Sequence, residues 1–230
     1  MLKWIILAIV VLIVIAVAGV VFWVQTEAPF HREHISQGSG KRALILYHPS
    51  RDAHFSDDLT MALARGFAEA DFPVDRWTMT SRTPSKPKGY AIVAVVSNTF
   101  FSAPDWPTLR YLKRARLEDQ NVIAIMAGGG KTERAEQKLG FALERTGAHV
   151  LDLRPLWTTR PNEPGSEGPA NRQVAMKIAR SMAREAGQLV RERNATAADQ
   201  APATRENPVQ PAPAPTNDLP QGAEARETAP

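Results

Sequence analysis

The chain has no cysteine among its 230 residues. This absence excludes disulfides, thiolate catalysis and Cys-ligated zinc or iron–sulfur centres, because each of them needs a cysteine sulfur. It does not fix the cellular compartment. Catalytic patterns are also scarce: no Ser, His and Asp residues have the order and spacing of a catalytic triad, and no two carboxylates have a spacing that indicates an acid–base pair. The sequence therefore assigns no catalytic residue and no metal site.

Charge is absent from one long stretch, Trp4 to Val24. A helix rises about 1.5 Å per residue, so this stretch would reach roughly 30 Å, the thickness of a bilayer's hydrocarbon core. Fifteen of its positions are Ile, Val, Leu or Phe. Each of these favours insertion by roughly 0.3–0.6 kcal/mol near the centre of a span. We therefore predict one transmembrane anchor within residues 1–24.

A cleaved signal peptide is the alternative interpretation of the same stretch. Lys3 gives a positive start, and Ala16 and Ala18 have the small-x-small spacing of a cleavage site. However, a signal core usually ends after about 7–15 apolar residues, and the apolar run here is longer. Trp4 and Trp23 also bracket the run, where indole rings favour the two membrane interfaces. Both observations favour a retained anchor.

The C-terminal segment, residues 195–230, has few large apolar side chains, with Val209 and Leu219 its only large aliphatics. It cannot bury enough apolar surface to offset the entropy of ordering it, so we predict a disordered Pro/Ala-rich tail. The segment has two basic and five acidic residues, so the whole-chain net charge of +4 leaves +7 on residues 1–194. A basic domain suits an anionic membrane surface, whereas nucleic-acid binding would need a clustered patch that the sequence lacks. We expect no nucleic-acid partner.

Residues 41–194 have the length of one domain, and residues 25–40, which end in Ser-Gln-Gly-Ser-Gly, are expected to be a flexible linker. Within the domain, apolar runs alternate with helical patterns. Strands are predicted at residues 42–47, 72–79, 90–96, 121–126 and 149–153. Helices are predicted over residues 56–70 and 107–117, along Ala135 to Leu143 and along Val174 to Leu189. This alternation indicates an α/β domain, a doubly wound five-stranded parallel sheet with helices on both faces. Ligands of such sheets bind at the carboxyl ends of the strands.

The loop after the third predicted strand, Ser97 to Pro104, reads Ser-Asn-Thr-Phe-Phe-Ser-Ala-Pro. It resembles the second flavin loop of the flavodoxin-like family, commonly Ser-Pro-Thr-Tyr-Trp-Gly-Lys-Pro. The resemblance covers about residues 44–153 and implies the flavodoxin-like strand order 2-1-3-4-5 with FMN as cofactor. It also implies that Phe100 or Phe101 lies against the isoalloxazine ring. The alternative is that both rings simply pack the domain. The backbone facing the polar edge of the ring would be that of Ser97, Asn98 and Thr99, although Asn98 replaces the usual Pro.

The loop after the first strand matches the family less well. The family's phosphate loop reads roughly Ser-x-Thr-Gly-x-Thr and holds a phosphate with hydroxyls, backbone N–H groups and a helix N-terminus. Residues 50–55 read Ser-Arg-Asp-Ala-His-Phe, which keeps the Ser but lacks the Gly and the final Thr. Asp52 adds a negative charge where a dianion should lie. Candidate ligands for a variant anion site are Ser50, Arg51, His54 and Ser56.

The loop after the fourth strand contains Gly128, Gly129 and Gly130. It resembles the Gly-rich segment that approaches the flavin in the family, although glycines between a strand and a helix often form only a tight turn. A P-loop interpretation of Gly130-Lys131-Thr132 fails, because that motif needs glycine where this chain has Ile125.

Two functions are therefore open. The first is a membrane-anchored, FMN-binding flavodoxin-like protein that takes part in electron transfer or quinone-type reduction, with a redox protein or a quinone as partner. The second is a degenerate domain without flavin that acts as a membrane-tethered interaction module. For the first function we expect a single-pass protein of a bacterial inner (plasma) membrane. Its domain would be cytoplasmic, where FMN and reduced donors are supplied and where Arg32, Lys41 and Arg42 would follow the span.

Overall fold

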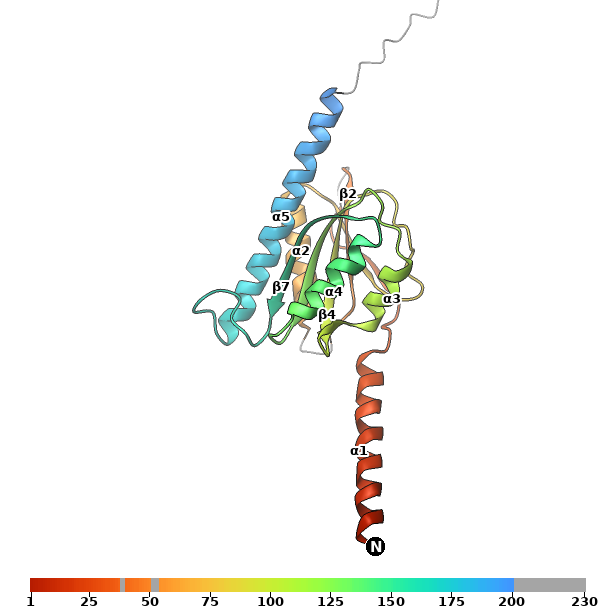
Figure 1. Cartoon of the computed structure of the whole chain (residues 1–230). Coiled ribbons are helices and arrows are strands. Elements are labelled where there is room, and N and C mark those ends of the chain that lie inside the picture. Colours follow the sequence, from red (N-terminus) through yellow and green to blue (C-terminus); the bar gives the residue numbers. More distant parts are fainter. Residues whose placement is uncertain (38–39, 51–53, 201–230) are drawn as a thin grey trace, which may run out of the picture.

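The computed structural model describes residues 1–37, 40–50 and 54–200. An apolar N-terminal helix, α1 (Leu2–Val24), projects from one end of a layered α/β domain, and the long helix α5 (Pro169–Gln200) runs along its side (Figure 1). Two predictions lie outside the described residues: the phosphate ligand Arg51 and residues 201–230 of the predicted tail.

Helix α1 is long and apolar enough to cross a membrane, and none of it is buried within the protein. Trp4 and Trp23 near its two ends are 75% and 59% exposed. A soluble domain would not leave so much apolar surface in water, so the helix acts either as a membrane anchor or as a signal sequence.

A twisted sheet forms the centre of the domain, and its strands follow the order β1-β3-β2-β4-β6-β7, with β5 paired to β4. The five strands β3, β2, β4, β6 and β7 are mutually parallel, which confirms the predicted order 2-1-3-4-5. The strands are β1 (Arg32–His34), β2 (Arg42–Tyr47), β3 (Val74–Thr78), β4 (Tyr90–Phe100), β5 (Ala103–Pro104), β6 (Asn121–Gly128) and β7 (His149–Trp157).

Helices cover both faces of the sheet. Successive side chains of a strand point to opposite sides, and in β2 the side chains on both sides are apolar, so each face needs a covering layer. Ala43 and Ile45 of β2 pack under α2 (Phe55–Glu69) and α5. Leu44 and Leu46 pack under α3 (Trp106–Arg114) and α4 (Glu133–Glu144). The result is two apolar cores separated by one sheet, as the predicted doubly wound arrangement requires.

The prediction that residues 25–40 form a flexible linker was wrong for part of this range. Arg32–His34 form β1, which pairs antiparallel with β3 at the edge of the sheet. The backbone N–H of His31 donates to Thr78 Oγ1 at 2.7 Å. Pairing satisfies backbone groups that the edge of β3 would otherwise leave open. The sequence does not reveal this strand, because three polar residues carry no alternating hydrophobic pattern.

The predicted end of the domain at Asn194 was also too early. Helix α5 continues to Gln200, so residues 195–200 are helical and not part of a disordered tail. This extension contains three alanines, and alanine has the highest helix propensity.

Candidate functional site

The carboxyl ends of β2, β4 and β6 meet at one edge of the sheet and enclose a small cleft of about 140 Å³. Five predicted site residues come together there: Ser50, Asn98, Thr99, Gly128 and Gly129. The cleft is also lined by Phe55, Ala127 and Thr158. The edge predicted to bind a ligand therefore does gather three loops that are distant in sequence.

Strand β4 ends in a hairpin that the sequence analysis treated as a loop. It runs to Phe100, and β5 pairs back so that Phe100 faces Ala103. The two turn residues, Phe101 and Ser102, have φ values of 46° and 57°. Tight hairpin turns with two positive φ angles usually contain Asn-Gly, so a Phe there stores strain of roughly 1–3 kcal/mol.

The strained turn leaves the Phe101 side chain 78% exposed. The rings of Phe100 and Phe101 are in edge-to-face contact, with centroids 4.6 Å apart. Within the described part of the chain, the cleft is lined by neither of these rings. The aromatic side chain in its wall is Phe55, which is 2% exposed.

Asn98 occupies the position where the second flavin loop of the flavodoxin-like family has proline, and it connects three elements of the domain. Its backbone N–H donates to Asp105 Oδ2 at 2.8 Å, and its Nδ2 donates to the His48 carbonyl at 2.8 Å. The Ser56 hydroxyl donates to Asn98 Oδ1 at 2.5 Å. Asp105 Oδ1 also accepts from the Thr108 N–H at 2.8 Å and so caps α3. The side-chain amide therefore joins the first loop to the start of α2, and the backbone N–H joins the same residue to the cap of α3.

The start of α2 differs from the predicted anion site. Helix α2 begins at Phe55, and His54 is its N-cap with a left-handed φ of 60°. Ser56 is fully buried, and its hydroxyl is committed to Asn98, so Ser56 is not presented to a ligand. Two acidic residues, Asp57 and Asp58, occupy the first turn. Their charges favour the helix dipole but oppose a bound dianion.

The glycines after β6 have different roles. A Cβ at Gly128 would lie 2.7 Å from Thr132 Cγ2 and 3.0 Å from Thr99 Oγ1, so the packing excludes a side chain. At Gly129 and Gly130, the nearest atoms would lie at 3.7 and 3.4 Å, and neither residue has a positive φ. Close packing therefore requires glycine at position 128. At positions 129 and 130 a side chain would fit, and its absence leaves the loop without side chains beside the cleft. Gly130 is not part of the cleft lining.

Two buried hydroxyls at this edge have no hydrogen-bond partner among the described residues: Ser97 Oγ and Thr99 Oγ1. An unsatisfied buried hydroxyl costs about 1–3 kcal/mol, so such groups mark places where a further partner is expected. Ser97 is fully buried within β4, while Thr99 belongs to the cleft lining. Of the two, only the Thr99 hydroxyl lies beside the cleft, although its oxygen is itself closed off from solvent.

Sequence reasoning missed Thr158, which follows β7. Its N–H donates to the Gly128 carbonyl at 2.9 Å and closes one side of the cleft. Strand β7 was predicted to end at Leu153 but continues to Trp157. The sequence does not indicate this extension because it contains Pro155, and proline usually argues against a strand. It is tolerated here because β7 is an edge strand, where the missing N–H is not needed.

These residues fit the ring of a flavin better than its phosphate. Gly129 and Gly130 have no side chains to narrow the site, and the Thr99 hydroxyl has no partner within the described ranges; both features suit a flat ligand with a polar edge. On the phosphate side, Ser56 faces inward and two carboxylates occupy the first turn of α2.

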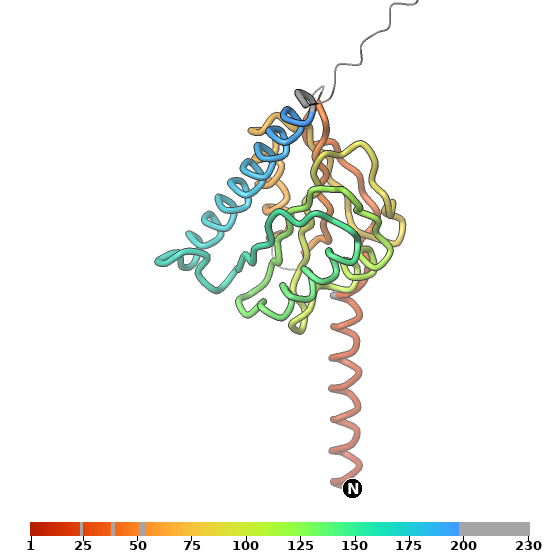
Figure 2. The backbone as a smooth tube through the Cα atoms, turned by 45° about the horizontal axis from the view of Figure 1, so that its top comes forward, coloured from red at the N-terminus to blue at the C-terminus, as the bar shows by residue number. Residues whose placement is uncertain are grey.

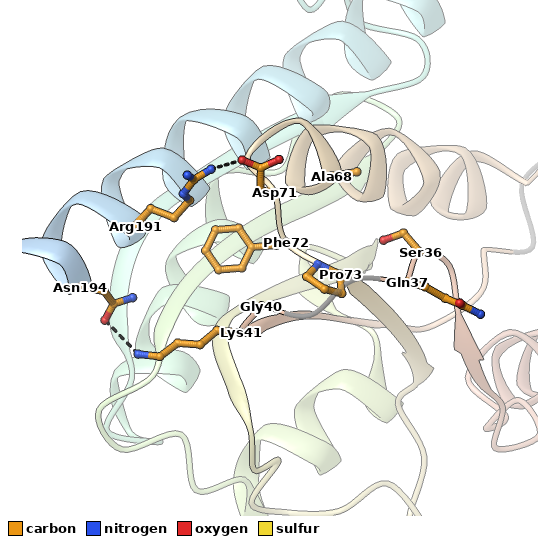
Figure 3. A pocket seen from close by; sticks show the side chains of 10 residues that line it. All are labelled: Ser36, Gln37, Gly40, Lys41, Ala68, Asp71, Phe72, Pro73, Arg191 and Asn194. Carbon is orange, nitrogen blue, oxygen red and sulfur yellow. Dashed lines mark hydrogen bonds and ion pairs between the residues drawn. The ribbon is translucent and has the colours of Figure 1, made fainter. Parts of the chain in front are cut away.

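A larger pocket of about 600 Å³ lies at the opposite edge, where β2 begins (Figure 3). Arg191 there is ion-paired with Asp71, and Lys41 Nζ donates to Asn194 Oδ1 at 3.3 Å. These contacts hold the last turns of α5 to the domain. The pocket is therefore a junction between elements, despite its size.

No protein-family model and no curated protein matches the sequence. Solved structures do match in fold. A flavodoxin from the domain Archaea is 14% identical with a TM-score of 0.51, over 65% of this chain and 99% of that one. A flavone reductase is 10% identical with a TM-score of 0.52, over 66% and 64%. The Flv1 flavodiiron core from Synechocystis is 15% identical with a TM-score of 0.52, over 69% and 38%. The domain therefore has the flavodoxin-like fold.

Proposed function

We propose that this chain is a membrane-anchored flavodoxin-like protein that binds FMN at the strand-end cleft and serves in electron transfer or quinone-type reduction. The observation that carries the proposal is a glycine-walled cleft at the edge where this fold binds ligands, with a Thr99 hydroxyl beside it that has no partner among the described residues. When bound, FMN supplies one- and two-electron transfer, and the protein contributes binding, orientation and electrostatics.

The residues of the cleft and its hairpin have proposed roles. Thr99 and the backbone of Asn98 and Gly129 would hold the polar edge of the ring. Phe100, which follows Thr99 but is outside the cleft lining, is the ring that the resemblance would bring against the face of the flavin. The phosphate end would be held by Ser50 and the backbone N–H groups at the start of α2, because helix N-termini attract anions. Arg51 is a further phosphate contact on sequence grounds.

A second candidate function is a flavin-free interaction module tethered to the membrane. Two observations favour it. The cleft of about 140 Å³ is smaller than the roughly 300 Å³ at which ligand pockets usually begin. The Ser56–Asn98 hydrogen bond also removes a predicted phosphate ligand. In this alternative, the hydrogen bonds of Asn98 to Ser56, His48 and Asp105 are purely structural.

An absorbance spectrum distinguishes the two functions. The full-length chain, extracted in detergent without denaturation, should show a flavin band near roughly 450 nm, as bound FMN would. Preparations that have lost the cofactor should quench the fluorescence of added FMN. A colourless preparation whose spectrum and FMN fluorescence are both unchanged by titration would remove the first function and leave the second.

A further inference from the structure

The end of α1 is attached to the same edge of the domain as the cleft. The backbone N–H of Trp106, the first residue of α3, donates to Gln25 Oε1 at 2.8 Å. Gln25 directly follows α1 and is 3% exposed. Both views show the yellow-green hairpin of β4 and β5 beside this end of α1 (Figures 1 and 2). In Figure 1 the arrowhead of β7 also points toward the end of the domain from which α1 projects.

Exposed aromatic side chains are concentrated at this end. C-terminal to α1, the large hydrophobic side chains exposed within the described ranges are Phe101, Trp106, Phe141 and Leu189. Two of the four are at this end. Trp106, 44% exposed, is bonded to Gln25, and Phe101, 78% exposed, is in the turn of the hairpin that Figures 1 and 2 show beside the end of α1. Phe101 also has a strained backbone. An aromatic ring held in water by a strained turn is doubly unfavourable unless something else contacts it.

Two carboxylates next to these aromatics, Asp105 and Glu27, are engaged by neighbouring groups of the protein. Asp105 is 3% exposed and caps α3. Glu27 accepts a hydrogen bond from the Ser81 N–H at 3.0 Å and lies 3.8 Å from Arg110. Asp105 and Glu27 therefore repel anionic lipid headgroups less than free carboxylates would.

We propose that Phe101 and Trp106 insert into the interfacial layer of the membrane, so that the hairpin and the start of α3 rest on lipid. The proposal rests on the proposed anchoring by α1. If α1 spans the bilayer, Gln25 lies at headgroup level, and the hydrogen bond holds Trp106 at that level too. Interfacial segments bury their apolar side chains about 5–10 Å deep, and aromatic rings favour this layer.

This placement has a consequence for the cleft. Thr99 lines the cleft and is two residues from Phe101 on the same hairpin. A hairpin resting on lipid would therefore open the cleft at the membrane surface. The substrate class that fits is a bilayer-dissolved quinone-type acceptor, which would reach the site without crossing water.

The absence of cysteine makes the test direct, because single labels can be introduced one at a time. Phe101→Cys is labelled with a polarity-sensitive fluorophore in the full-length chain, reconstituted in lipid nanodiscs that contain a quencher on the upper acyl chain. Phe141→Cys is the matched control, since Phe141 is 62% exposed on α4. Val11→Cys in α1 reports the span itself. We expect lipid quenching at positions 11 and 101 to be several-fold stronger than at 141, and aqueous iodide to quench only position 141.

The three labels separate the possible failures. Quenching at 11 with position 101 behaving like 141 would overturn the docking while leaving the anchor intact. Absence of lipid quenching at 11 would overturn the anchoring and the docking together. Protection of 101 from both lipid and aqueous quenchers would mean that protein covers the patch, and this would also overturn the proposal.

Discussion

Thr99 and Thr108 share one feature, a buried side-chain hydroxyl that forms no hydrogen bond among the described residues, but they lie in different parts of the domain. Thr99 lines the cleft, whereas Thr108 is in the first turn of α3. Valine has the same shape and no hydroxyl, so each substitution removes an unsatisfied group.

We expect Thr99→Val and Thr108→Val each to keep or slightly raise the stability of the flavin-free chain. Only Thr99→Val should weaken FMN binding, by about 0.5–1.5 kcal/mol or roughly 2- to 10-fold in Kd, the worth of one hydrogen bond. Fluorescence titration with FMN measures this difference. Equal affinities for the two variants would remove Thr99 from the proposed site.

Asp75 of β3 is a second residue with a testable role. It is 3% exposed and accepts hydrogen bonds from Arg42 Nε at 2.9 Å and Tyr90 Oη at 2.7 Å, with His34 Nδ1 at 2.6 Å. Burial, the largest single influence, opposes ionisation, but the hydrogen bonds from Arg42, Tyr90 and His34 outweigh it and lower the pKa of Asp75. The carboxylate thus joins four strands, β1 to β4, at the edge away from the cleft.

Because the folded-state pKa of Asp75 is lowered, its stabilising effect is complete above the ordinary value of 3.8 and is lost as the pH falls through the lower folded value. Asp75→Asn should reduce the free energy of unfolding by about 1.5–3 kcal/mol at pH 7, and the deficit should shrink below about pH 4. Chemical unfolding at several pH values measures it. Asp152→Asn is the control, because its pair with Arg154 is exposed and should contribute under about 1 kcal/mol. A deficit for Asp75→Asn that does not change with pH would contradict the assignment.

The helices α2 and α5 approach closely because α2 contains Gly66. A Cβ at this position would overlap the Arg180 carbonyl oxygen and lie 2.9 Å from the Ala183 Cβ. Gly140 on α4 is different, since its nearest atom, Leu153 Cδ1, would be 3.7 Å away. The same substitution therefore separates packing from helix propensity.

Gly140→Ala should stabilise the domain by up to about 1 kcal/mol, the propensity difference between the two residues. Gly66→Ala gains the same propensity but forces two packed helices apart, so a net destabilisation of about 1–3 kcal/mol is expected. Thermal unfolding of the two variants gives the comparison. Stabilisation by Gly66→Ala would show that the two helices can separate at little cost.

Strand and helix patterns identified most elements but few of their ends. The apolar runs of β2, β4 and β6 are unambiguous because these strands are buried on both faces. The last residues of β4 and β7 were missed because polar residues and a proline interrupt the apolar pattern. Strand β1 is stabilised by its neighbour β3 and not by its own composition. Local patterns cannot report such long-range pairing.

At the scale of the whole molecule, the sequence predicted the layers, the parallel strand order and the edge that gathers the cleft loops. It could not predict which polar side chains would be used internally. In the sequence, Asn98 looked like a departure from a flavin loop, yet in the structure its side chain is hydrogen-bonded to Ser56 and His48. Whether a hydroxyl faces a ligand or another side chain depends on contacts between loops about 40 residues apart. One sequence without its fold does not contain that information.

The orientation of the whole chain in the membrane gives the last prediction. Positive residues near the span favour the cytoplasmic side, and Arg32, Lys41 and Arg42 follow α1, whereas Lys3 precedes it. The proposed flavin function points the same way, because FMN and its reductants are cytoplasmic, and a basic domain suits the anionic inner leaflet. We therefore expect a reporter that needs disulfides, fused after Pro230, to be inactive, and a reporter that fluoresces in the cytoplasm to be bright at the same position. The opposite pair of results would place the domain outside. Electrons would then have to reach the cleft from the membrane side, where the hairpin is proposed to rest, and a bilayer quinol would become the donor in place of a soluble nicotinamide.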